Sequence, residues 1–327
     1  MLYRFNKEKD VSYVSLLYSI VVFIFFFGMT AISGMEFYRM SVIGEFVFIL
    51  LPAILFVEFG VARGKKEFLR LNKIKVSTGI LVSFIILFSL PLFGLINNLV
   101  YYIFAELFGA VEIYSVPVPE GTRGVLLSLI VLALVPAVCE EVLFRGVIQG
   151  VLRRHGHFFA IFFTGALFSF LHLDIQRFIG IWLLGSLIGY MVYRTNSLYT
   201  GILAHLVNNV FSVAASYLFV DDQQFAEDGI QRITKESYTI FMAEDTTTII
   251  SSIVLVVIFG ALFAWLFARF IRVTDSMREI RIKTGFDKAA RGYLLLVPPF
   301  ALIIFLYILQ SKSIISGMDA LLNLIAG

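Results

Sequence analysis

Long apolar runs alternate with short polar connections along this chain. A helix needs roughly 20 mainly apolar residues to cross the hydrocarbon core of a bilayer. The first run is too long for the apolar region of a cleavable secretory signal, so we interpret it as a span. Nine segments are expected to cross a membrane: 13–33, 41–60, 76–98, 124–150, 158–175, 177–193, 198–219, 247–270 and 293–315. The pattern predicts an all-α, polytopic integral membrane helix bundle with about nine transmembrane helices.

Composition supports this interpretation and excludes other classes of protein. Of the 327 residues, 59% are hydrophobic and 15% are charged, whereas soluble domains have about 45–50% and about 25%. The net charge of +3 gives no electrostatic support to nucleic-acid binding. With one cysteine, Cys139, the chain can form neither an internal disulfide nor a cysteine-rich zinc site.

Basic residues are concentrated in alternate connections. Segments 61–75 and 268–292 are rich in Lys and Arg, whereas 99–121 contains neither and 220–246 is mainly acidic. Lys and Arg favour short cytoplasmic loops, so the first two segments are expected inside and the other two outside. Nine spans then predict a cytoplasmic N-terminus and an extracytoplasmic C-terminus.

Three ionisable residues lie in the fourth apolar segment, within "EEVLFR". A charged side chain at a helix centre costs about 2.5–3.5 kcal/mol on insertion scales. Glu141 and Arg145 are four residues apart, so they share a helix face and can pair. Glu140 points about 100° away and has no partner in its own segment, which makes it a candidate functional residue. The alternatives are a structural ion-pair network or charges that reach the membrane surface.

Polar residues also occur in the fifth and seventh segments, within "FSFLHLD" and "AHLVNN". His172 lies near the end of its span, and His205 and Asn209 share one helix face. A structural histidine and an asparagine that joins helices are the alternatives. If each span is centred on its apolar run, Glu140 and His172 are offset by roughly 10 Å at 1.5 Å per residue. A tilted or longer fifth helix, or another boundary at Asp174, would close this gap.

These residue types suit direct attack of water on an amide. A carboxylate and a histidine, here Glu140 and His172, can hold a water and remove its proton. A second histidine and an amide, here His205 and Asn209, can donate hydrogen bonds to a developing oxyanion. The sequence contains neither the G-x-S-x-G motif of serine hydrolases nor the H-E-x-x-H motif of zinc proteases.

A metal site is the alternative use of the same residues. One carboxylate and two histidines form a known hydrolytic zinc set, and Glu140, His172 and His205 would supply it. We nevertheless expect neither a metal nor another cofactor, because only two histidines lie in apolar segments and one is better used as an oxyanion donor.

The three motifs resemble those of the CAAX protease and bacteriocin-processing (CPBP, or Abi) family of intramembrane proteases, which includes type II CAAX prenyl endopeptidases. "EEVLFR", "FSFLH" and "HLVNN" match its EExxxR, FxxxH and HxxxN motifs in order, over about residues 120–215. The resemblance implies that Glu140 and His172 activate water, that His205 and Asn209 stabilise the oxyanion, and that Glu141 and Arg145 shape the site. It implies a glutamate-dependent endopeptidase acting on a membrane-associated protein or peptide within the lipid bilayer.

The motifs suggest a division of the chain into three parts. Residues 1–119 would contain three N-terminal spans, 120–219 the catalytic core, and 220–327 an acidic extracytoplasmic loop and two further spans. Two non-proteolytic functions remain as alternatives: an immunity or scaffold protein, and a transporter that relays protons through Glu140 and His172. A transporter would favour an internal repeat, and none is visible by eye.

Glycines recur at a spacing of four in two of the apolar segments. The pairs Gly146 and Gly150, and Gly185 and Gly189, have the small-xxx-small spacing that allows helices to approach closely. Close helix packing is therefore expected around the motif residues.

Overall fold

The computed structural model describes residues 10–61, 64–114, 119, 121–219, 230–234, 246–278 and 290–309. Seven helical segments in this part of the chain are long and apolar enough to span a membrane: Val11–Ala31, Phe37–Gly60, Val76–Phe108, Gly121–His155, Phe178–Thr195, Leu198–Leu218 and Ile253–Val273. Two shorter apolar helices cover His157–Leu171 and Leu294–Leu309. The all-α membrane bundle is confirmed. Each of the nine expected segments contains a helix among its described residues, but two of these helices are short, so nine crossings remain a prediction.

The described part of the chain consists mainly of α-helices, with short π-helical and 3₁₀-helical segments between some of them. The α-helices are α1 (Asp10–Ala31), α2 (Phe37–Ile43), α3 (Leu51–Gly60), α4 (Lys65–Phe68), α5 (Val76–Phe108), α6 (Gly121–Ser128), α7 (Val135–Glu141), α8 (Gln149–Leu152), α9 (His157–Leu171), α10 (Phe178–Thr195), α11 (Leu198–Phe219), α13 (Thr246–Val273) and α14 (Ala290–Tyr293). Short 3₁₀ helices cover Arg153–His155 and Leu294–Leu296.

Three π-helical segments interrupt the spans in the described part of the chain. Gly44–Leu50 joins α2 to α3, Leu129–Leu134 joins α6 to α7, and Val142–Ile148 joins α7 to α8. π-Helical turns are rare and frequently occur at functional sites. The first of these segments contains Glu45 and the third contains Arg145.

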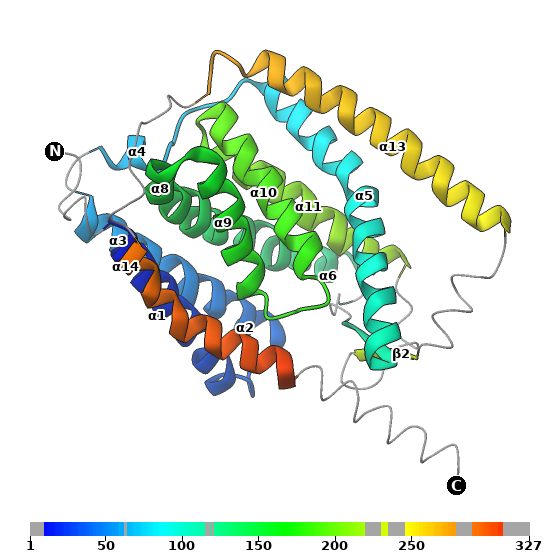
Figure 1. Ribbon diagram of the computed structural model, residues 1–327, viewed down its shortest axis with the longest axis horizontal. Coiled ribbons are helices and arrows are strands. Elements are labelled where there is room, and N and C mark those ends of the chain that lie inside the picture. Colours follow the sequence, from blue (N-terminus) through cyan, green and yellow to red (C-terminus); the bar gives the residue numbers. More distant parts are fainter. Residues whose placement is uncertain are drawn as a thin grey trace, which may run out of the picture.

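The fourth span lies at the centre of the bundle. Helices α9, α10 and α11 stand beside it, α5 and α13 form one flank, and α1, α2, α3 and α14 form the other (Figure 1). One apolar core joins the Cys139–Leu152 region to α1, α3 and α9. A second joins α5, α10, α11 and α13. The motif-bearing helices are therefore held from both sides by helices that carry no motif.

Two of the four spaced glycines bring helices close together, and a third brings the connection before α5 close to the fourth span. A Cβ atom at Gly189 would lie 2.9 Å from Gln149 Oε1, and one at Gly185 would lie 3.2 Å from Arg145 Nη2. A Cβ atom at Gly146 would lie 2.9 Å from the side chain of Leu69. At Gly150 it would meet only ordinary contacts. The expected close packing is thus confirmed around Arg145 and Gln149.

A small antiparallel sheet joins the two connections expected outside the membrane. Strand β1 (Ala110–Tyr114) pairs with β2 (Ile230–Thr234), with Glu112 opposite Arg232. The sequence pattern did not predict these strands. Their pairing means that the 99–121 and 220–246 connections meet at one end of the bundle, as the charge pattern requires. Residues 220–229 and 235–245 of the acidic connection, and the C-terminal residues 310–327, lie outside the described part of the chain.

The basic connections lie at the opposite end of the bundle, where they contact the end of α10. Arg194, at the end of α10, donates through Nε to Thr274 Oγ1 at 3.1 Å, and Asn72 Nδ2 donates to Asn196 O at 2.7 Å. Arg70 belongs to the basic connection 61–75. Its side chain is buried, and its Nη2 donates to the carbonyl oxygen of Arg145. The basic connection is thus attached to the motif helix.

We expect the two ends of α5 to be reached from opposite sides of a membrane. The buried Cys139 is first replaced by alanine, so that an introduced cysteine is the only thiol in each variant. Two variants then carry one cysteine each, at the exposed position Lys66 or at the exposed position Glu106. In right-side-out vesicles, an impermeant maleimide should label Glu106→Cys at once and Lys66→Cys only after permeabilisation. The reverse pattern would contradict the cytoplasmic N-terminus, and labelling of both before permeabilisation would contradict a span over α5.

Candidate functional site

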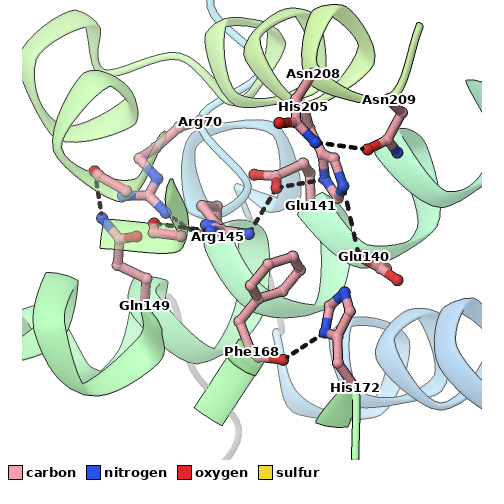
Figure 2. Close-up of polar contacts among 12 residues, drawn as sticks. Arg70, Glu140, Glu141, Arg145, Gln149, Phe168, His172, His205, Asn208 and Asn209 are labelled. Atoms are coloured by element: carbon pink, nitrogen blue, oxygen red, sulfur yellow. Dashed lines mark hydrogen bonds and ion pairs between the residues drawn. The ribbon is translucent and has the colours of Figure 1, made fainter. Parts of the chain in front are cut away.

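Side chains from three motif-bearing segments line one cavity of about 300 Å³. Glu140 comes from α7, His172 follows the end of α9, and His205 and Asn209 come from α11. Figure 2 shows them facing a common space. The four residues singled out in the sequence, separated by up to 69 positions, are brought together by the fold.

Glu140 and His172 line the same cavity, so the offset expected from centred spans does not separate them. The fifth span was expected over 158–175, but α9 covers His157–Leu171 and His172 is its C-cap residue. Fifteen residues span roughly 22 Å, less than the roughly 30 Å of bilayer hydrocarbon. The helix therefore ends at the level of the cavity and presents His172 to it.

Asp174 marks the boundary between the fifth and sixth spans. Its Oδ1 accepts hydrogen bonds from the backbone N–H of Gln176 at 3.0 Å and of Arg177 at 3.3 Å. The side-chain amide of Gln176 in turn exchanges two hydrogen bonds of 3.1 Å with the backbone N–H and carbonyl oxygen of Glu112 in β1. The turn after His172 is thus fixed by side-chain acceptors and by the small sheet, which stabilises the position of the histidine.

Phe168 orients both histidines. His172 Nδ1 lies 3.0 Å from the carbonyl oxygen of Phe168; a carbonyl only accepts, so Nδ1 carries the proton. Neutral His172 therefore keeps a lone pair on Nε2. The Phe168 ring contacts the rings of His172 and His205 edge-on, with centroids 4.8 Å and 5.6 Å away. This is the arrangement expected of a histidine that can accept a proton from water.

Glu141 and Arg145 form the expected pair, fully buried. Arg145 Nη1 donates to Glu141 Oε1 at 2.6 Å, and neither side chain is exposed. Arg145 Nη2 also donates to the carbonyl oxygen of Gly185 at 2.8 Å, and the guanidinium lies 4.7 Å from the centre of the Phe168 ring. A buried charge needs a partner and hydrogen bonds of this kind to be tolerated.

Glu141 has a second partner that its spacing along the helix does not reveal. His205 Nδ1 lies 3.0 Å from Glu141 Oε1, so this ring nitrogen donates to the carboxylate. The other nitrogen, Nε2, lies 3.7 Å from Glu140 Oε2, beyond hydrogen-bond distance. A Cβ atom at Gly201 would lie 2.6 Å from Glu141 Oε2; the glycine allows α11 to bring His205 to the carboxylate.

The two adjacent asparagines are coupled. Asn208 Nδ2 donates to Asn209 Oδ1 at 3.0 Å, as Figure 2 shows. Only Asn209 lines the cavity. Because its oxygen accepts from Asn208, the amide nitrogen of Asn209 is left to donate elsewhere. Asn208 does not line the cavity, but it contacts Asn209.

Glu45 is a cavity residue that the sequence reasoning missed. It lies in the π-helical segment Gly44–Leu50 and lines the cavity with Glu140. The signal was present, since Glu45 is a carboxylate within the apolar run 41–60, and ionisable groups inside spans are functional candidates. No motif residue accompanies it in that run, so nothing local distinguished it from a structural charge.

The alternative metal set receives no support from the geometry. Within the described ranges, no group of three or more His, Cys, Asp and Glu residues is placed to hold a metal ion, and this includes Glu140, His172 and His205. The expected absence of a metal or other cofactor stays a prediction.

Comparisons with known proteins agree with the motifs. Residues 122–211 match the family model described as "Type II CAAX prenyl endopeptidase Rce1-like". A Bacillus subtilis (strain 168) protein named "Putative membrane peptidase YdiL" is 29% identical over 131 residues, 40% of this chain and 52% of that protein. The chain thus spans about half the length of this curated relative. No solved structure matches. The matched region contains all three motifs, and the family resemblance is confirmed.

Removing Arg145 should destabilise the fold. Arg145→Ala leaves the carboxylate of Glu141 buried without its cation, a loss that costs about 3–5 kcal/mol. Folding yield and thermal stability in detergent should both fall. The matched control is Lys65→Ala, which removes the cation of the exposed Glu58–Lys65 pair and should cost at most about 1 kcal/mol. Equal stability of the two variants would show that Glu141 does not depend on Arg145.

Proposed function

We propose that this integral, multi-pass membrane protein, which shares the Rce1-like endopeptidase region over residues 122–211, is an intramembrane endopeptidase. It would hydrolyse a peptide bond of a membrane-associated protein or peptide. The observation that carries the proposal is the single cavity lined by Glu140, His172, His205 and Asn209. A membrane peptidase name on the Bacillus subtilis relative is consistent with it.

Water activation is assigned to Glu140 and His172. The attacking water lies between the Glu140 carboxylate and the Nε2 lone pair of His172, and gives up its proton as it attacks the scissile carbonyl carbon. The fixed Nδ1 proton on His172 supports this role, because it leaves Nε2 as an acceptor. The proton then passes to the leaving amine as the tetrahedral intermediate collapses.

The oxyanion is assigned to Asn209 and His205. The amide nitrogen of Asn209 has its donors available, since the amide oxygen is used by Asn208. His205 commits Nδ1 to Glu141, so it can donate from Nε2 only as an imidazolium. The carboxylate of Glu141 stabilises that cation. The ion pair of Glu141 and Arg145 thereby shapes the site through His205.

Glu140→Gln should abolish cleavage while the fold is kept. The amide preserves the size of the side chain but removes the base. Membrane fractions from cells that produce the wild type or the variant should differ by a cleavage product that only the wild type generates. Glu58→Gln, the same change at an exposed residue, is the control and should match the wild type. If Glu140→Gln generates every wild-type product, a non-catalytic scaffold or transport function replaces the protease.

Substitution of Asn209 should lower turnover more than substitution of Asn208. Loss of one oxyanion donor costs about 10²–10³ in turnover, so Asn209→Ala should lower kcat by that factor. Substrate binding should change little, because this contact forms in the transition state.

Asn208→Ala removes one neutral hydrogen bond that orients Asn209. Such a bond contributes about 0.5–1.5 kcal/mol, so the loss should stay within roughly tenfold. Turnover of a reporter peptide by purified variants, measured apart from binding, compares the two. A larger loss in Asn208→Ala than in Asn209→Ala would overturn the oxyanion assignment.

A further inference from the structure

Glu45 brings a second carboxyl group to Glu140. The two residues line the same cavity of about 300 Å³, so their carboxyl groups share one small space. They come from different spans: Glu45 from the π-helical segment after α2, and Glu140 from α7. Oε2 of each residue is buried and accepts no hydrogen bond from another described group.

The side chain of Glu45 points into the protein, whereas the two side chains that follow it in the chain point outward. Phe46 and Val47, the next two residues, are 46% and 44% exposed, as expected of side chains that face lipid. Glu45 instead turns its carboxyl group into the protein. The π-helical turn places one more residue in the turn than an α-helix does, and this change of register separates the carboxyl-bearing face from the apolar one.

Two ionised carboxylates cannot form a hydrogen bond, because both only accept. Like charges in one buried site also oppose each other, so one of the two groups keeps a proton. The surroundings favour the negative charge on Glu140, since His205 Nε2 lies 3.7 Å from Glu140 Oε2. The proton therefore belongs on Glu45.

We propose that Glu45 is a positioning residue of this site: its protonated carboxyl group donates a hydrogen bond to the carboxylate of Glu140 and fixes the direction of that base. The hydrogen bond is inferred from the shared cavity and the two buried Oε2 atoms. Its effect on turnover rests on the proposed function. Glu45 would not contact the reacting atoms. It would instead hold one oxygen of Glu140, so that the other faces the water.

Two substitutions of similar size separate this role from simple space filling. Glu45→Leu removes the donor, whereas Glu45→Gln keeps an N–H donor in its place. A hydrogen bond to a charged group is worth roughly 10-fold to 100-fold, so Glu45→Leu should lower kcat by that factor with KM changed less than about threefold. Glu45→Gln should recover most of that loss. Phe46→Leu, on the exposed face of the same turn, is the control and should keep the wild-type kcat.

A thermal double-mutant cycle tests the hydrogen bond without any assay of proteolysis. Glu45→Leu should lower the Tm in the wild type, because it leaves the Glu140 carboxylate buried without a donor. In a Glu140→Leu background the same change should have no effect or raise the Tm. Additive Tm changes would overturn the inference, whether or not cleavage is observed.

The turnover assay distinguishes the two proposals. If Glu45→Leu keeps the wild-type kcat while Glu140→Gln is inactive, the role of Glu45 is overturned. The proposed protease function would still stand. Equal loss of kcat in Glu45→Leu and Glu45→Gln would also overturn it, since the donor would then be irrelevant. Coupled Tm changes with no cleavage by the wild type would support the hydrogen bond and contradict the proposed function.

Discussion

The buried ion pair between Glu141 and Arg145 is the constraint on which the rest of the site depends. Both side chains are withdrawn from solvent, and charges in such surroundings require several compensating contacts. The protein supplies them from three other elements: the Gly185 carbonyl on α10, the Phe168 ring on α9 and the His205 imidazole on α11. Satisfying this one pair therefore holds α9, α10 and α11 against the motif-bearing fourth span.

Neighbouring glutamates have different environments because of helix geometry. Successive residues on a helix point about 100° apart, so Glu141 faces the ion pair while Glu140 faces the cavity. The two carboxylates are joined again through His205, whose ring nitrogens lie 3.0 Å from Glu141 and 3.7 Å from Glu140. This arrangement places a charge-stabilised imidazole beside a carboxylate, as the proposed hydrolysis requires.

Helices without motifs complete the site. The buried Arg70 donates to the Arg145 carbonyl from the connection before α5, and Gln149 Nε2 donates to Gly189 O at 3.0 Å. The segment Gly44–Leu50 adds the carboxyl group of Glu45. The N-terminal spans are thus structurally part of the cavity, even though the matched family region covers only residues 122–211.

Local patterns in the sequence determined the helical segments, the membrane class and the pairing of Glu141 with Arg145. Each of these depends on residues close together in the chain: apolar run length, or a spacing of four on one helix. The tertiary structure alone decided the early end of α9 at Leu171, the β1–β2 pairing, the contact of Glu141 with His205, and the cavity that Glu45 shares with Glu140. These contacts join residues on different elements, up to 124 positions apart. Their formation depends on how the helices pack, and periodicity within one helix carries no information about which face of another helix it will meet.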